Sequence, residues 1–480
     1  MTVVVIGGGI TGLAAAQSLG RAGIPTLLLE ASERLGGKVR TERVDGFVID
    51  HGPDSFVTYR PAAVRLATDL GLADRIVRPL EPRAVFIRTR GRLRRLPDGM
   101  GLALPTRLRP FVTTDLFTPI DKLRMALDLV LPRERRAGDL GVGPFLERRL
   151  GRALVDRLAG PLIGGVYGTP IDELSLDAVV PALRASERKH RSLLLASLAE
   201  GRARAATSRG EPASVETRPS PASPFVAMAG GTGELVDALA AALRAMPGME
   251  VRTGVPVTGV DAERAGALVR LRGGEAIRAE AVIVATEGPV AAELLAGASP
   301  NAARAIRSIR QSTTTIVNLA YRADQLSSGV MGHGFLVADD EQLGISACTI
   351  TSAKWANRAP EGTLLARAFV RSGLATAGDG AAPVDDAALV ALAHRDVAAT
   401  LGIRGVPVLT RIARFPRVMP QYTVGHLERV AMVENALAAA PAIRLAGASY
   451  RGAGLPDCIA QGEAAAAAIA ALFSAQPIKP

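Results

Sequence analysis

A glycine-rich turn near the N-terminus constrains the fold of this chain more than any other feature of its sequence. The turn reads Gly7-x-Gly9-x-x-Gly12 and follows a short β-branched run at residues 3–6. A segment of helical character comes next, and a second apolar run ends at Glu30. Strand, glycine turn, helix and second strand with a terminal carboxylate form the dinucleotide-binding fingerprint. The sequence therefore predicts an α/β fold with a Rossmann-like, doubly wound sheet.

The glycines of this turn have separate physical roles. The first permits the tight turn, the second lets the backbone approach a diphosphate, and the third allows close packing of helix on strand. The diphosphate lies at the helix N-terminus, and Glu30 accepts hydrogen bonds from ribose hydroxyls. The residues expected to line the diphosphate site are Gly7, Gly8, Gly9, Ile10, Thr11 and Gly12.

Composition narrows the class of protein further. The chain has 480 residues, about three structural units, and is 48% hydrophobic, so global disorder is excluded. Two cysteines, Cys348 and Cys458, cannot form a disulfide framework and favour a reducing, cytoplasmic location. The net charge of 57 − 46 = +11 indicates either a solvated basic surface or an anionic partner. Dispersed basic residues and few aromatics argue against nucleic acid.

Residues 3–20 carry no charge and are long enough to resemble a membrane span. The central glycines would weaken a helix at its midpoint, and no basic segment precedes the run as in a signal peptide. A buried strand, a turn and a helix explain it better. The sequence therefore predicts a soluble protein with at most weak peripheral membrane contact.

The residues after Glu30 distinguish FAD from NAD. Together with Glu30, the stretch from Ala31 to Lys38 resembles the Glu-x-x-x-Arg-x-Gly-Gly-[Arg/Lys] extension of amine-oxidase-like flavoproteins. No second glycine fingerprint, Cys-x-x-Cys pair or clustered metal ligands accompany it, so the cofactor is expected to be FAD and no metal is expected. The resemblance implies further FAD contacts at Ala31, Arg34, Gly36, Gly37, Lys38, Gly52, Pro53, Asp54, Ser55, Val257, Phe415, Ala453, Gly454, Leu455 and Pro456.

Longer motifs indicate a family. They include residues 45–47, 52–56, 160–168 (Gly-Pro-Leu-Ile-Gly-Gly-Val-Tyr-Gly), 187–193, 419–426 and 447–459. Over nearly its whole length the chain resembles the soluble bacterial porphyrinogen oxidases of haem biosynthesis, above all the coproporphyrinogen III oxidases. It is more distantly similar to protoporphyrinogen oxidases. It departs from the family at Phe415 and Ile350, where relatives commonly have Trp.

The resemblance implies a six-electron aromatisation. In each of three turns a porphyrinogen passes a hydride to flavin N5, and O2 reoxidises the flavin and releases H2O2. Rearrangement within the macrocycle redistributes hydrogens, so no catalytic side chain is assigned. The substrate is coproporphyrinogen III in the favoured interpretation and protoporphyrinogen IX in the alternative. The remaining expected partners are O2 and, in transient contact, other enzymes of the haem pathway.

The propionate groups of a porphyrinogen require cationic side chains at the rim of an apolar binding pocket. Residues 88–95 contain five arginines, and in a single strand Arg88, Arg90, Arg92 and Arg94 would share one face. A solvated edge strand explains the same run. The candidate substrate contacts are Arg94, Arg95, Arg107, Tyr167, Lys189 and Tyr422.

Seven segments are predicted. FAD-binding parts span 1–83, 225–300 and 427–480; parts of an interleaved α+β substrate domain span 84–105 and 301–426; a helical lobe spans 106–200; a flexible loop spans 201–224. The FAD domain is expected to be of the GR2 type. Three other functions remain open: a flavin amine oxidase, a carotenoid desaturase, and a flavin or porphyrin carrier without turnover.

Overall fold

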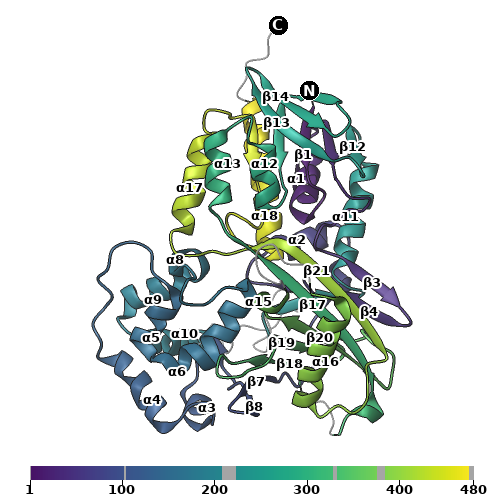
Figure 1. Ribbon diagram of the computed structural model, residues 1–480. Helices are drawn as coiled ribbons and strands as arrows, with labels where there is room; N and C mark the ends of the chain where they lie inside the picture. Colours follow the sequence, from purple (N-terminus) through teal and green to yellow (C-terminus); the bar gives the residue numbers. More distant parts are fainter. Residues whose placement is uncertain (1, 102–103, 208–222, 328–331, 376–383, 475–480) are drawn as a thin grey trace.

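The computed structural model describes residues 2–101, 104–207, 223–327, 332–375 and 384–474 (Figure 1). Most of the predicted loop at 201–224 lies outside these ranges, and residues 201–207 continue helix α10 (Leu193–Thr207). No helix in the described ranges is long and apolar enough to cross a membrane.

A five-stranded parallel sheet forms the end of the molecule that holds the described N-terminal residues (Figure 1). Its order is β12 (Met249–Arg252), β2 (Thr26–Leu29), β1 (Val3–Ile6), β16 (Ala281–Val284) and β22 (Ile443–Leu445). Strands far apart in sequence are therefore neighbours. All four residues of β1 and of β16 are buried, because parallel strands are covered on both faces. The predicted doubly wound α/β class is confirmed.

Helices cover both faces of this sheet. On one face lie α1 (Ile10–Arg21), α2 (Ala62–Asp69), α11 (Gly233–Ala245) and α18 (Leu455–Ser474). On the other lie α12 (Gly288–Leu294), α13 (Pro300–Arg307), α17 (His426–Leu437) and the antiparallel strands β13 (Val257–Glu263), β14 (Gly266–Leu271) and β15 (Ala276–Ala279). Helices α1 and α18 pack closely because Gly462 has no side chain; a Cβ there would lie 2.2 Å from the Thr11 carbonyl oxygen.

A seven-stranded mixed sheet forms the opposite end of the molecule (Figure 1). Its order is β21 (Leu409–Pro420), β17 (Gln311–Arg322), β20 (Thr363–Val370), β19 (Ile345–Ile350), β18 (Gly334–Val337), β7 (Val85–Thr89) and β8 (Arg92–Arg95). Helix α16 (Asp386–Leu401) packs on one face through an apolar core. The other face turns toward the first sheet and the helical lobe, since Ile87 of β7 belongs to the lobe's core.

The arginine run at residues 88–95 is a hairpin, which corrects the prediction of one strand with a common basic face. Arg90 and Gly91 have φ angles of 51° and 70° and form the turn between β7 and β8. Such left-handed pairs match the twist of two-residue hairpins. The arginines therefore lie on two strands and face different neighbours.

Two short hairpins and a three-stranded sheet connect the large sheets. Strands β3 (Thr41–Val44) and β4 (Phe47–Asp50) pair with each other, and β9 (Met100–Gly101) pairs with β10 (Leu104–Pro105). Strand β11 (Phe225–Met228) lies between β5 (Phe56–Val57) and β6 (Ile76–Val77).

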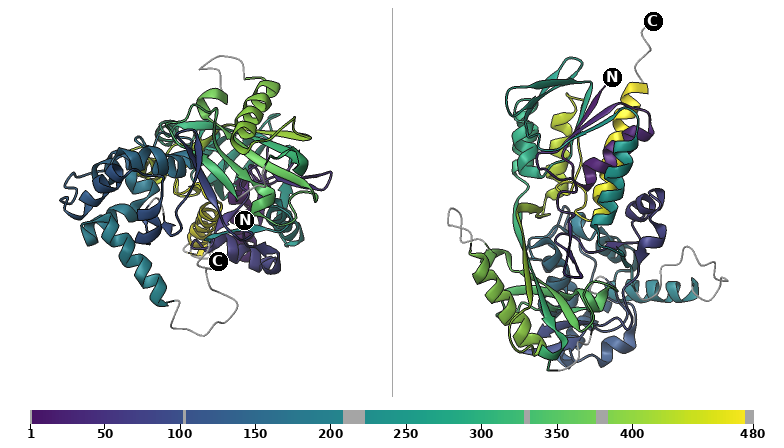
Figure 2. Two further views of the ribbon diagram at one scale, coloured as in Figure 1. Left: turned by 90° about the horizontal axis from the view of Figure 1, so that it is seen from below. Right: turned by 90° about the vertical axis from the view of Figure 1, so that its right-hand side faces the viewer.

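The helical lobe lies beside the seven-stranded sheet, as the view from below shows (Figure 2). Its helices are α3 (Leu108–Thr113), α4 (Pro119–Ala126), α5 (Val142–Leu150), α6 (Arg152–Leu154), α7 (Gly165–Tyr167), α8 (Leu176–Val179), α9 (Pro181–His190) and α10. Between α6 and α7, residues Val155–Gly164 form a π-helix that contains Pro161. π-Helical turns are rare and occur frequently at functional sites.

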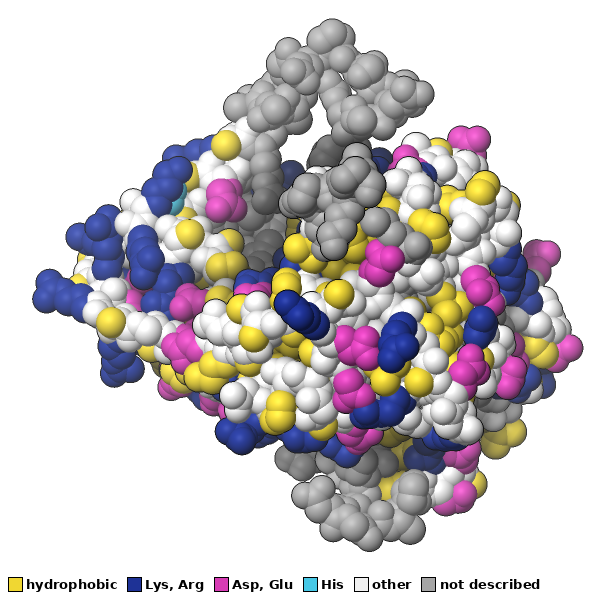
Figure 3. Space-filling model, turned by 90° about the horizontal axis from the view of Figure 1, so that it is seen from above, with side chains coloured by type: hydrophobic (Ala, Val, Ile, Leu, Met, Phe, Trp, Pro, Cys, Tyr) yellow, Lys and Arg dark blue, Asp and Glu magenta, His cyan; other side chains and the backbone are white. Residues whose placement is uncertain are grey.

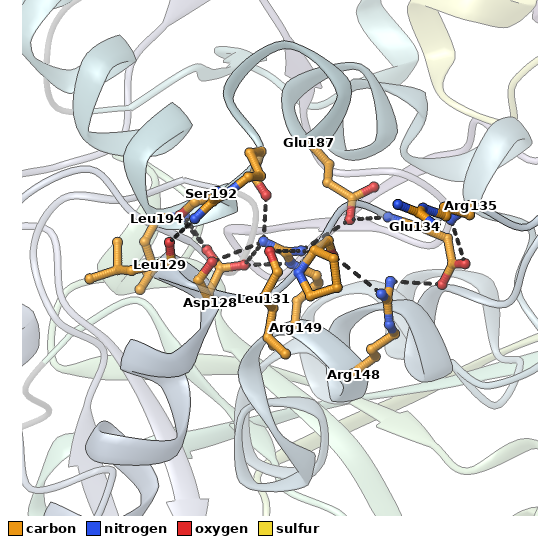
Figure 4. Close-up of polar contacts among 12 residues, drawn as sticks. Asp128, Leu129, Leu131, Glu134, Arg135, Arg148, Arg149, Glu187, Ser192 and Leu194 are labelled. Carbon is orange, nitrogen blue, oxygen red and sulfur yellow. Dashed lines mark hydrogen bonds and ion pairs between the residues drawn. The ribbon is translucent and has the colours of Figure 1, made fainter.

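A buried ion network holds the lobe together (Figure 4). The Arg149 side chain on α5 is fully buried; its Nε donates to Asp128 at 2.5 Å and its Nη1 to Glu187 at 3.3 Å. Asp128 also accepts a hydrogen bond of 2.6 Å from the Ser192 hydroxyl. The network joins α5, the 3-10 turn η2 (Leu127–Leu129), α9 and the start of α10.

Charges of both signs are mixed over most of the face seen from above, and Lys and Arg gather mainly over the helical lobe (Figure 3).

We expect Arg149→Met to destabilise the protein by about 3–5 kcal/mol, because it leaves Asp128 and Glu187 as buried, uncompensated carboxylates. Thermal unfolding measures the effect. The matched control is Arg152→Met, whose side chain is 49% exposed and forms surface ion pairs, and we expect it to change stability by less than about 1 kcal/mol. An Arg149→Met protein as stable as the control would contradict the structural role of the network.

Candidate functional site

The glycine turn forms an open cradle at the carboxyl end of β1. A Cβ on Gly12 would lie 1.9 Å from the Gly7 carbonyl oxygen, and one on Gly7 would lie 2.9 Å from the Ala285 oxygen. Gly9, in contrast, has nothing within 4 Å of a Cβ position. Gly9 precedes α1 and is extended, so the open space lies at a helix N-terminus. This is the place where a helix favours an anionic diphosphate.

Glu30 lies next to this cradle. Its Oε2 accepts a hydrogen bond of 2.7 Å from the Gly8 amide, and its Oε1 accepts bonds from the Ser32 amide and hydroxyl. Both carboxylate oxygens therefore lie beside the glycine turn, as a ribose contact requires. Ala31 follows Glu30 and is exposed. The Val255 amide donates to the Glu30 carbonyl, so Val257 at the start of β13 lies near Glu30.

The extension after Glu30 returns to the cradle. Gly36 donates its amide to the Gly8 carbonyl at 2.8 Å, and a Cβ on Gly37 would lie 3.2 Å from the Gly9 Cα. Arg34 stabilises this bend by donating to the Gly37 carbonyl at 2.6 Å. Lys38 Nζ then lies 3.4 Å from a Glu287 oxygen and 3.5 Å from the Val418 carbonyl. The extension therefore connects the cradle with β16 and β21.

The turn from Gly52 to Ser55 packs directly on this extension. A Cβ on Gly52 would lie 1.8 Å from the Lys38 carbonyl oxygen, so only glycine fits. The Pro53 carbonyl accepts a hydrogen bond of 2.7 Å from the Thr232 hydroxyl. These contacts thus fix the first two residues of the turn.

Asp54 is the charged centre of the turn. Its carboxylate accepts hydrogen bonds from Lys354 at 3.0 Å and from the indole of Trp355 at 3.2 Å. Arg367 lies 3.6 Å away. Burial alone would raise the pKa of Asp54, but the Lys354 and Arg367 cations outweigh it and hold that pKa well below its usual range. Sequence analysis missed all three partners, although Trp355 is the single tryptophan of the chain.

The C-terminal loop between β22 and α18 closes the site from the other side. Tyr422 donates its hydroxyl hydrogen to the Ala448 carbonyl at 2.6 Å and accepts from the Gly452 amide at 2.8 Å. Its ring stacks on His426 at a centroid distance of 3.9 Å. Ala453 and Gly454 follow, and Leu455 and Pro456 begin α18. The loop is therefore held from beneath by an aromatic pair.

Tyr422, which the sequence predicts as a substrate contact, lies beneath this loop. The residue is 1% exposed and both hydrogen-bonding functions of its hydroxyl are engaged by the loop. Its position is that of a residue that orients the loop. Tyr167 lies 5.5 Å from it, ring to ring, and remains half-buried.

The other predicted substrate residues lie in separate places. Arg94 forms an ion pair with Asp115, and Arg95 lies 3.3 Å from Asp98. Arg107 is exposed just before α3, and Lys189 is exposed in the last turn of α9. The charges of Arg94 and Arg95 are thus compensated by neighbouring carboxylates.

Phe415 lies on β21 and pairs with Thr314 on β17. Along β20, the half-buried Phe369 pairs with Ile316 and Ala347. The core beneath α16 does not include Phe415, Phe369, Ile316 or Ala347, so these side chains lie on the opposite face of the sheet, where they form an apolar surface beside Arg367. In the described ranges, no group of three His, Cys, Asp or Glu side chains is placed to hold a metal ion.

Three features together define an FAD-dependent oxidoreductase. They are the glycine cradle at the N-terminus of α1, the carboxylate of Glu30 beside it, and the N-terminus of α18 after the C-terminal loop. The family model described as "Flavin containing amine oxidoreductase" matches residues 10–470. The chain belongs to this family, and within it to the bacterial porphyrinogen oxidases.

Individual relatives support this assignment. The chain is 44% identical to a coproporphyrinogen III oxidase of Propionibacterium freudenreichii, over 100% of this chain and 92% of the relative. It is 32% identical to the protoporphyrinogen oxidase of Homo sapiens, with 98% of each chain covered. A crystal structure from Exiguobacterium sp. 255-15, assigned as a protoporphyrinogen oxidase, superimposes with a TM-score of 0.82 at 31% identity, covering 98% and 99%.

We expect Gly9→Ala to weaken FAD binding by about tenfold or more while the apoprotein remains as stable as the wild type, because its Cβ enters only the open cradle. Gly12→Ala is expected to lower stability itself by about 1–3 kcal/mol through overlap with Gly7. Flavin fluorescence titration and thermal unfolding of the apoprotein separate the two effects. The control is Gly373→Ala, whose Cβ also meets nothing within 4 Å but lies outside the cradle, so we expect it to leave FAD affinity unchanged. Undiminished FAD affinity in Gly9→Ala would contradict the proposed cradle.

His426 makes stability depend on pH. The residue is fully buried; its Nε2 lies 2.7 Å from the Tyr450 carbonyl, while its Nδ1 has no partner among the described residues. Burial lowers the pKa of His426 to about 4, from about 6.5 in the unfolded chain. Between these values the unfolded state binds the extra proton, so stability falls as pH decreases from about 6.5 to 4, by roughly 3 kcal/mol in total.

The variant His426→Gln keeps a side-chain donor but cannot titrate. We expect the difference in unfolding free energy between wild type and variant to shrink by roughly 3 kcal/mol between pH 7 and pH 4. Denaturant unfolding at several pH values measures it, and parallel curves would show that His426 is not the responsible group.

Proposed function

We propose that this protein is an FAD- and O2-dependent coproporphyrinogen III oxidase that produces coproporphyrin III. The full-length similarity to a coproporphyrinogen III oxidase, at 44% identity, carries the proposal. The apolar sheet face with Phe369 and Phe415, opposite the FAD segments, supports a flat, largely hydrocarbon substrate.

FAD supplies the hydride acceptor in this reaction, and O2 accepts the electrons as H2O2. The chain's own residues bind and orient the two partners. We propose that Gly7–Gly12 hold the diphosphate, Glu30 the ribose, and Lys38 with residues 52–55 and 453–456 the flavin end.

The FAD-binding segments are proposed to be 1–83, 225–300 and 427–480, with substrate segments 84–105 and 301–426 around the lobe. We further infer a cytoplasmic location, supported by two free, buried cysteines. The expected partners are the porphyrinogen, O2 and, transiently, other haem-pathway enzymes.

A protoporphyrinogen oxidase is the second candidate, supported by the full-length similarity to the human enzyme. An amine oxidase receives less support, because Tyr422 and Tyr450, which would have to form an aromatic amine cage, are 1% and 5% exposed. A carrier without turnover has no specific observation in its favour.

The test gives the purified holoprotein coproporphyrinogen III and protoporphyrinogen IX in parallel under air. We expect porphyrin fluorescence to rise above autoxidation fastest with coproporphyrinogen III, with three H2O2 per porphyrin because six electrons leave as three pairs. Faster protoporphyrinogen turnover would favour the second candidate. No rate with either substrate would refute both.

A further inference from the structure

Strand β20 presents Arg367 on the face that looks away from α16, and Arg371 follows directly after the strand. Leu364, Ala366, Ala368 and Val370 belong to the core beneath α16. Because side chains alternate along a strand, Arg367 and Phe369 point to the opposite face.

The two arginines lie at opposite ends of the apolar surface around Phe369. Arg367 contacts the FAD turn, since its Nη2 donates to the Gly52 carbonyl and its Nη1 lies 3.6 Å from Asp54. Its guanidinium also lies 5.0 Å from the centroid of the Phe369 ring. Arg371 is four residues further on, about 13 Å along the strand direction. Arg367 is therefore committed to the cofactor side.

Arg371 lies where the sheet meets the lobe. It precedes α15 (Ser372–Ala375), which Figure 1 shows between the lobe and β17. A Cβ on Gly168, at the end of α7, would lie 3.1 Å from the Ser372 hydroxyl and 3.2 Å from that of Ser312. The π-helix is close as well, because a Cβ on Gly160 would lie 2.9 Å from Asp339.

The guanidinium of Arg371 is incompletely paired. Its Nε donates to the Leu343 carbonyl at 3.0 Å, and its Nη1 lies 3.9 Å from Asp339, whose side chain is 50% exposed. Its Nη2 is buried and has no hydrogen-bond partner among the described residues. A buried cationic donor without a partner carries a desolvation cost that a carboxylate ligand removes. Arg88, by comparison, is paired with Glu341.

We propose that Arg371 binds a propionate of the substrate at the lobe end of the apolar surface and thereby selects for a tetrapyrrole with carboxylates around its whole rim. The inference rests on the proposed function. Coproporphyrinogen carries propionates on all four pyrroles, whereas protoporphyrinogen carries apolar vinyl groups on two. A substrate that places a vinyl group at Arg371 leaves the guanidinium unpaired.

The test compares Arg371→Leu, Arg371→Lys and wild type. For Arg371→Leu we expect the KM for coproporphyrinogen III to rise roughly 10- to 100-fold with a small change in kcat. The KM for protoporphyrinogen IX is expected to stay within about twofold, and Arg371→Lys to recover part of the loss. The matched control is Arg322→Leu, whose side chain is 59% exposed and forms an ion pair with Asp324.

Binding of the products, measured by fluorescence without turnover, gives an independent readout. Loss of coproporphyrin III affinity in Arg371→Leu, with FAD content and thermal unfolding unchanged, supports the proposal. Unchanged coproporphyrin affinity and KM, or equal losses for both tetrapyrroles, overturn it. If wild type oxidises neither porphyrinogen, the proposed function fails, and coproporphyrin binding still decides whether Arg371 is a carboxylate site.

Discussion

The partly buried carboxylate of Asp54 joins the two halves of this molecule. It lies in a turn next to the glycine cradle, yet Arg367 belongs to β20 of the seven-stranded sheet. Lys354 ends the short helix α14 (Thr351–Lys354), which follows β19, and Trp355 comes directly after it. Two cations around one carboxylate leave a local positive excess beside the region assigned to the flavin. An uncompensated charge in this position would be costly, so sheet and turn are fixed relative to each other. The apolar surface around Phe369 owes its orientation toward the cofactor segments to this contact.

The cofactor half of the fold could be predicted because its signals are local. The strand at residues 3–6, the turn and the helix that follows are adjacent in sequence, and each residue type is required by backbone geometry within a few residues. Residues 281–286 form a continuous apolar run and residues 457–473 an Ala-rich run, patterns that indicate a buried strand and a helix, and these segments contain β16 and most of α18. The close approach of Gly12 to Gly7 gives the physical reason for the fingerprint.

The substrate half could not be predicted as fully, because its contacts join distant segments. Five arginines in residues 88–95 suggested a common face, but the turn at Arg90 and Gly91 divides them. Tyr422 carries no local signal that distinguishes a ring facing substrate from one beneath a loop. Arg371 stands in no motif, and only its place directly after β20, with Asp339 as its neighbour, makes it notable. Identity of a residue is visible in sequence, whereas its partner is set by tertiary packing.

The central claim is that FAD held in this cradle accepts electrons from a porphyrinogen lying on the apolar sheet face. The most direct measurement mixes the holoprotein with coproporphyrinogen III in the absence of O2 and follows the visible absorption of oxidised flavin. The account predicts rapid loss of that absorption together with appearance of porphyrin, and its return when air is admitted. Flavin that stays oxidised in the presence of excess coproporphyrinogen III would contradict the account.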